Sequence, residues 1–171
     1  CRDVFTNSAE FGVINQRDFF DHDVANVDNI QGYYIVRPND YVYNPRISTT
    51  APVGPINRNK LGGNGVMSPL YYVFRVEKQR DGILIFLDYY FKSNMWHNFM
   101  FKNGNSGARS DRFSISDSTF SLMPILYPQK EEEQQNIGQV FINLEKLMRT
   151  ESIKLAKFRS MKHSLLQKMF V

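Results

Sequence analysis

The sequence predicts an α+β fold in which an irregular mixed-sheet domain is followed by one long, projecting C-terminal α-helix. Up to Pro128 the chain is rich in aromatic residues, glycine and asparagine, and short strand-like stretches alternate with loops. After Pro128 there is no further proline, and apolar residues recur every three or four positions, which is the helical period. We therefore expect a globular domain over residues 1–128 and a long helix within residues 129–171.

The strands of the domain are predicted from stretches rich in aromatic and β-branched residues. Residues 32–36 (Gly-Tyr-Tyr-Ile-Val) and 41–43 (Tyr-Val-Tyr) have this composition, and an Arg-Pro-Asn-Asp turn signal separates them. Residues 70–76 give the strongest strand prediction.

Two short helices are predicted after these strands. The period of residues 83–91 is ambiguous, but the spacing of their apolar side chains favours a helix. A second short helical face is expected around Trp96, Phe99 and Met100. Residues 57–65 and 103–112 are polar and rich in glycine and asparagine, so we expect them to form loops.

Charge and periodicity both indicate the C-terminal helix. Glutamates fill positions 131–133, where the dipole at a helix start favours negative charge, and basic residues gather at the other end. A helix over 133–168 would be about 54 Å long, which exceeds the diameter of the domain, so it should project. Its apolar stripe then requires a partner helix, unless the helix packs wholly on its own domain. The predicted helix–helix interface comprises Ile137, Val140, Leu144, Leu147, Leu155, Phe158, Met161 and Leu165.

The overall charge points only weakly to an anionic partner. The formal net charge is +4, and the isoelectric point is about 9.2. Up to Pro128 there are 13 Lys and Arg against 12 Asp and Glu, and from Gln129 onward there are 8 against 5. The domain is therefore nearly neutral, and any contact it makes with DNA must come from local patches.

Composition disfavours several other classes of protein. The single cysteine, Cys1, permits no internal disulfide and fits the reducing cytoplasm. The three histidines lie far apart, so no metal site is expected. No signal peptide is visible, and no apolar run approaches the roughly 18 residues that span a membrane. We expect a cytoplasmic protein.

Motifs of catalysis are missing from the sequence. There is no Gly-x-x-x-x-Gly-Lys phosphate loop, and no lysine has an acidic residue two positions before it, as common metal-dependent nucleases require. Residues 44–46 (Asn-Pro-Arg) resemble the Asn-Pro-Pro-aromatic motif of amino-methyltransferases, but Arg46 replaces the second proline. No glycine-rich loop for a methyl-donor cofactor is present. We therefore expect neither catalytic residues nor a cofactor.

Two polar loops combine cationic and hydrogen-bonding side chains in the way that DNA recognition requires. Arginine can pair with guanine and asparagine with adenine in the major groove, while Ser, Thr and Lys hold phosphates. The alternative is that both loops are ordinary solvated loops, with Arg46 pinned to its own domain. The predicted DNA-binding residues are Arg46, Ser48, Thr49, Arg58, Asn59 and Lys60 in the first loop region, and Arg109, Ser110 and Arg112 in the second.

Six strings in order resemble the target-recognition domain and conserved helix of type I restriction–modification specificity subunits. Two lie in the predicted strands, at 41–46 (Tyr-Val-Tyr-Asn-Pro-Arg) and 65–71 (Gly-Val-Met-Ser-Pro-Leu-Tyr). The others are Gly-Ala-Arg at 107–109 before Phe-Ser-Ile, Met-Pro-Ile at 123–125 before Pro128, Glu-Gln-x-x-Ile at 133–137, and Leu-Leu-Gln-Lys-Met-Phe at 165–170. The resemblance covers nearly the whole chain.

This resemblance implies a non-catalytic subunit of prokaryotic cytoplasm that reads double-stranded DNA. Such subunits read a bipartite site with two recognition domains, and two long helices pack antiparallel to fix the distance between the halves. They recruit methyltransferase subunits and, through them, the restriction subunit. This chain holds one recognition domain and one helix, about half of such a subunit. The resemblance therefore implies either a fragment of a longer subunit or a half-subunit that pairs with a second half or with its own copy.

Two other functions are compatible with the sequence. The chain can be a protein-assembly module with little DNA affinity of its own, because the helix requires a partner whether or not the loops bind DNA. It can also be a solitary adenine methyltransferase, although the missing cofactor loop and the substitution at Arg46 argue against this.

Overall fold

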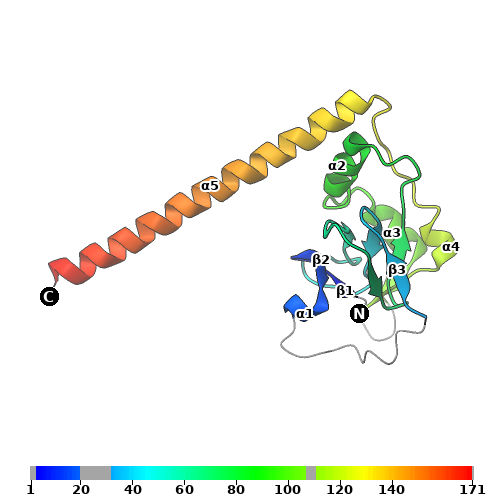
Figure 1. Ribbon diagram of the computed structural model, residues 1–171, viewed down its shortest axis with the longest axis horizontal. Helices are drawn as coiled ribbons and strands as arrows, with labels where there is room; N and C mark the ends of the chain where they lie inside the picture. The colour runs from blue at the N-terminus through cyan, green and yellow to red at the C-terminus, as the bar shows by residue number, and fades with distance from the viewer. Residues whose placement is uncertain (1–2, 20–31, 107–110, 171) are drawn as a thin grey trace.

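The computed structural model describes residues 3–19, 32–106 and 111–170 and has the predicted α+β architecture (Figure 1). Small sheets and short helices form a domain, and one long helix leaves it. The strands are β1 (Asp3–Ser8), β2 (Gly12–Asn15), β3 (Tyr34–Val36), β4 (Tyr41–Tyr43), β5 (Ile56–Arg58), β6 (Gly65–Met67), β7 (Tyr72–Phe74), β8 (Asn105–Ser106) and β9 (Phe113–Ser114). The helices are α1 (Gln16–Phe19), α2 (Asp81–Tyr90), α3 (His97–Asn103), α4 (Asp117–Phe120) and α5 (Glu131–Met169).

The described strands form three small sheets. The first has the order β2-β1-β6-β3, in which only β1 and β6 run parallel. The second has the antiparallel order β5-β4-β7, and β8 pairs with β9 in the third. Strand β4 connects two hydrophobic clusters, because alternate side chains of a strand point to opposite faces. Tyr41 and Tyr43 enter the larger cluster, and Val42 enters the smaller one.

The larger cluster is rich in aromatic residues and lies between the second sheet and helices α2, α3 and α4. Trp96 is buried, and its indole N–H donates a hydrogen bond to the Phe91 carbonyl. The rings of Tyr43 and Phe120 stack at a centroid distance of 4.9 Å. These large rings allow a small domain to bury much apolar surface with few residues.

Most elements predicted from the sequence are confirmed, with shorter strands than expected. Strands β3, β4 and β7 lie within the predicted stretches, and α2 and α3 coincide with the predicted helical faces. The loop predicted over 57–65 is wrong at both ends, where β5 pairs with β4 and β6 begins. The loop predicted over 103–112 is also wrong in part, because β8 pairs with β9. Strands β5 and β6 pair with β4 and with β1 and β3, which are well separated from them in the sequence, and local composition cannot reveal such pairing.

Helix α5 projects from the domain, as predicted (Figure 1). It spans 39 residues and is therefore about 58 Å long at 1.5 Å per residue. Its first part packs along α2, and every residue from 143 to 170 is exposed. In the described part of the chain, no helix is long and apolar enough to cross a membrane.

Candidate nucleic-acid interface

The two loops that were predicted to bind DNA meet in the structure. Arg46 and Arg112 form an isolated antiparallel backbone bridge. The amide of Ile47 donates to the Asp111 carbonyl at 2.9 Å, and the amide of Phe113 donates to the Pro45 carbonyl at 2.7 Å. Segments that are far apart in the sequence therefore present their side chains from one surface.

A tight turn follows Arg46 and holds the hydroxyl groups of this surface in place. The amide of Ala51 donates both to the Ser48 carbonyl and to the Ser48 hydroxyl, each at 3.1 Å. Thr49 and Thr50 are exposed at the tip of the turn. Gly54 closes the loop with φ +84°, and a Cβ there would lie 2.0 Å from the Asn44 carbonyl oxygen, so no other residue fits.

A groove of about 310 Å³ runs beside this turn. Arg46 and Arg112 both line it and both are exposed. Within the described residues, neither guanidinium group makes a hydrogen bond or an ion pair. Both are therefore available to a phosphate or to the edge of a guanine base. The polar residues of the groove are Thr6, Asn7, Ser8, Asn44, Ser48 and the two arginines.

A network of asparagines that the sequence interpretation missed supports the Arg46 loop. Asn7 is 1% exposed, and its amide nitrogen donates to the carbonyls of Val42 (2.7 Å) and Pro55 (3.2 Å). Asn44 donates from Nδ2 to the Asn7 carbonyl at 2.7 Å and accepts at Oδ1 from the Arg46 amide at 3.0 Å. Asn44 therefore ties the start of the Arg46 loop to β1. No signal in the sequence distinguishes Asn7 from the exposed asparagines.

Arg58, Asn59 and Lys60, which were predicted to bind DNA, lie elsewhere and have partners within the domain. Arg58 donates to both carboxylate oxygens of Asp88, from Nε at 2.9 Å and from Nη2 at 2.6 Å. Lys60 lies 2.7 Å from the same carboxylate. Asn59 is 1% exposed, and its side chain bonds to the Gly63 carbonyl and the Leu61 amide. These three residues join β5 and the following turn to the domain, so we do not include them in the interface.

The remaining predicted residues divide between described and undescribed parts of the chain. Arg109 and Ser110 lie outside the described residues. Ser48, Thr49 and Arg112 lie at the groove or at the tip of the adjoining turn. The interface that we consider below therefore consists of Arg46, Ser48, Thr49 and Arg112.

A second candidate surface is the apolar stripe on α5. Of the eight residues predicted to form the helix–helix interface, Ile137 is half-buried and the other seven are exposed. At 3.6 residues per turn, Leu147 and Leu165 lie about 180° around the helix from Gly138, which packs on α2. The stripe thus faces away from the chain's own domain, and a partner helix could follow it along its whole length.

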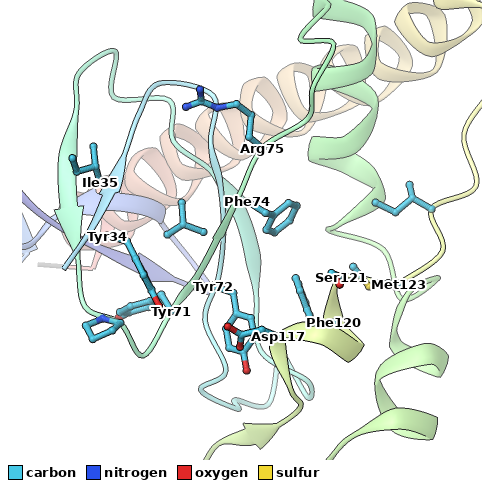
Figure 2. Close-up of a pocket in the computed structure, with 13 residues that line it drawn as sticks. Tyr34, Ile35, Tyr71, Tyr72, Phe74, Arg75, Asp117, Phe120, Ser121 and Met123 are labelled. Carbon is cyan, nitrogen blue, oxygen red and sulfur yellow. The ribbon is translucent and has the colours of Figure 1, made fainter. Parts of the chain in front are cut away.

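Another groove, of about 670 Å³, lies between β3, β7 and α4, and aromatic and aliphatic side chains make up most of its lining (Figure 2). The rings of Tyr72 and Phe74 pack against that of Phe120, with centroid distances of 5.3 Å and 5.7 Å. Its arginine, Arg75, is held by Asp40 at 2.5 Å. We assign no ligand to this groove.

In the described part of the chain, no group of three or more His, Cys, Asp or Glu could hold a metal ion.

Comparison with known proteins identifies no family for this chain. No protein-family model matches the sequence, and no curated protein is significantly similar to it. The functional assignment therefore depends on the residues and the geometry described above.

Proposed function

We propose that this chain is one half of a sequence-specific DNA-binding specificity subunit of a type I restriction–modification system. In this proposal the domain reads one half of a bipartite DNA site, and the chain itself carries out no catalysis. The observation that carries the proposal is the meeting of the Arg46 and Arg112 loops. It presents two guanidinium groups, without partners among the described residues, beside serine and threonine hydroxyls. Guanidinium groups supply base readout, and the hydroxyl groups fit phosphate contacts.

The long helix supports the second part of the proposal, pairing with another half-subunit. Its exposed apolar stripe requires a partner, and acidic residues 131–133 lie at the opposite end from the basic residues Lys162 and Lys168. An antiparallel partner would place unlike charges beside one another at both ends. The two domains would then lie at the two ends of the paired helices, each reading one half-site. Methyltransferase subunits, and through them a restriction subunit, complete the proposed assembly.

A binding measurement with matched arginine variants tests DNA recognition. Duplexes selected from a randomised library by the full chain would be titrated by fluorescence anisotropy. We expect the Arg46→Ala, Arg112→Ala double variant to lose at least about tenfold in affinity, since each guanidinium contact contributes about 1–3 kcal/mol. Arg37→Ala with Lys78→Ala removes the same charge from other exposed sites and should retain more affinity. Equal losses in both double variants would overturn the assignment of the interface.

The second candidate function is a protein-assembly module with little DNA affinity of its own. The exposed stripe on α5 favours it, because this surface requires a protein partner regardless of DNA. The two candidates are separated by the same titration. An assembly module would form dimers but select no duplex from the library.

A further inference from the structure

Helices α2 and α5 run side by side in the same direction, and their contacts follow one another along both helices. Arg80, just before α2, pairs with Glu131 at 3.2 Å, and Lys92, just after it, pairs with Glu145 at 2.8 Å. We call this set of contacts, between residues 80–92 and 131–145, the clamp. The rest of α5, residues 146–169, is exposed and forms a free arm about 36 Å long.

The centre of the clamp is held at close range by glycine. Gly138 is buried two turns into α5, and a Cβ placed on it would lie 2.1 Å from Cγ2 of Ile85. Glycine is a poor helix former, so a glycine inside a long helix calls for a packing reason. The close approach of Ile85 supplies that reason. A second close approach lies at Gly82 of α2, where an added Cβ would be 3.0 Å from the Glu131 carbonyl oxygen of α5.

The far end of the clamp is fixed by an aromatic and charged group. The ring of Tyr89 stacks on that of Phe141 with 5.0 Å between centroids. The carboxylate of Glu145 accepts hydrogen bonds from the Tyr89 hydroxyl at 3.0 Å and from Lys92 at 2.8 Å. These bonds hold α5 to the domain directly before the arm begins, so they help to set the direction of the arm.

We propose that the clamp, with Gly138 at its tightest point, fixes the direction of the arm relative to the DNA-reading surface and so sets the spacing between half-sites that a pair of chains can read. The spacing part of this inference rests on the proposed function. Gly138, Ile85 and Glu145 are positioning residues in this scheme, because they act on DNA only through the direction of the arm.

The geometry makes spacing sensitive to small changes in the clamp. An alanine Cβ at position 138 would overlap Ile85, and relieving this overlap requires α5 to move about 1 Å away from α2 at this point. With the Arg80–Glu131 contact held about 10 Å away along the helix, that shift tilts α5 by about 5°. Because this contact is the pivot, a tilt of about 5° moves the far end of α5, about 57 Å along the helix, by about 5 Å. This displacement exceeds the 3.4 Å rise of one base pair.

The direction of the arm can be measured without DNA by pulsed electron paramagnetic resonance. Spin labels would be placed at Lys102→Cys in the domain and Lys157→Cys in the arm, in a Cys1→Ser background, diluted with unlabelled chain. We expect Gly138→Ala to shift the distance peak by about 2 Å, and Gly138→Ala with Ile85→Ala to restore it. Gln139→Ala, an exposed substitution one residue away, is the matched control and should leave the peak unchanged.

A second variant keeps the test valid if Gly138→Ala folds poorly. Glu145 is exposed, so Glu145→Gln should leave the fold intact and broaden the distance distribution. An unchanged peak in Gly138→Ala, or a distribution in Glu145→Gln as narrow as in the wild type, would overturn the role of the clamp. These outcomes do not depend on DNA binding.

The spacing itself is read with duplexes that carry two copies of the selected half-site separated by spacers of graded length. We expect Gly138→Ala to change the preferred spacer by at least one base pair and the Ile85→Ala double variant to restore it. A changed arm direction with an unchanged spacer preference would overturn the spacing role alone. If the wild type selects no duplex, the proposed function and the spacing role fail, while the distance measurement still decides whether the clamp directs the arm.

Discussion

Arg46 and Arg112 lie opposite each other in an isolated antiparallel bridge, so two exposed guanidinium groups start from neighbouring backbone positions. The bridge fixes the separation of their Cα atoms while leaving both side chains free to rotate. Asn44 holds the Arg46 side of the bridge through its hydrogen bond to the Arg46 amide. A rigid backbone carrying rotatable cations suits a surface that must match the groove of a duplex.

Arg46→Lys should separate base reading from charge. Lysine keeps the positive charge but lacks the planar fork that pairs with guanine O6 and N7. We expect affinity for the selected half-site to fall by roughly 1–3 kcal/mol while affinity for random duplex stays the same. Competition titrations at a fixed salt concentration measure both. If the substitution left the affinity for the selected duplex and the affinity for random duplex both unchanged, Arg46 would contact only phosphate.

Charges placed on the arm stripe should break the pairing of α5. Leu144→Asp and Phe158→Asp each put a carboxylate at the centre of the predicted helix interface, where it would be buried without a partner. We expect monomers by light scattering where the wild type is a dimer. Ser160→Asp adds the same charge about 140° from Leu147 around the helix and should leave the dimer intact. A monomeric wild type would contradict self-pairing.

Asn7→Ala should strongly destabilise the domain. The substitution removes the buried hydrogen bonds that Asn7 donates to the Val42 and Pro55 carbonyls and the one that its Oδ1 accepts from Asn57. We expect the free energy of unfolding to fall by about 2–4 kcal/mol, measured by urea titration. Asn64→Ala, at an exposed asparagine, is the control. A loss no larger than that of the control would show that the asparagine network contributes little.

The Asp88 carboxylate should matter for stability rather than for DNA binding. Asp88→Asn leaves Arg58 partly buried without its anion, which should lower the free energy of unfolding by about 3 kcal/mol. Arg58→Gln should also destabilise the domain and leave the DNA affinity of the folded protein unchanged. Glu77→Gln removes an exposed carboxylate and serves as the control. Loss of DNA affinity in a folded Arg58→Gln variant would return Arg58 to the interface.

The attachment of α5 should weaken in acid because of Glu145. Its hydrogen bond from Lys92 holds the pKa of Glu145 below the usual value, so the carboxylate is favoured in the folded state. This stabilisation is complete above the usual glutamate pKa and is lost as the pH falls through the lowered value. Glu145→Gln should therefore destabilise at neutral pH, by less than about 1 kcal/mol because the pair is exposed, and have no effect in strong acid.

The alkaline limit of the same contact is set by Tyr89. Burial and the hydrogen bond to Glu145 raise the pKa of Tyr89 to about 12. The stabilisation that the protonated Tyr89 hydroxyl gives to the folded state is therefore lost as the pH rises through that value. Unfolding curves of the wild type and Glu145→Gln over a pH series measure both limits. Glu151→Gln, at a carboxylate paired only within α5, is the control. A pH-independent difference between the wild type and Glu145→Gln would contradict the assignment.

The sequence by itself determined the elements whose signals are local. The three-and-four spacing of apolar residues predicts α5 and its exposed stripe, and the Tyr-Val-Tyr run predicts β4. These predictions hold because hydrophobic period and β propensity act over a few neighbouring residues. Strand β5 was missed because Ile56 and Arg58 are stabilised by β4 and by α2, which lie outside any local window.

Only the tertiary structure decided which cations are available to a ligand. In the sequence, Arg46, Arg58 and Arg112 are equivalent basic residues in polar loops. The fold brings Asp88 of α2 onto Arg58, whereas Arg46 and Arg112 meet each other and remain exposed. The physical reason is that an ion pair depends on distance in space, and long-range pairing of strands and helices sets that distance.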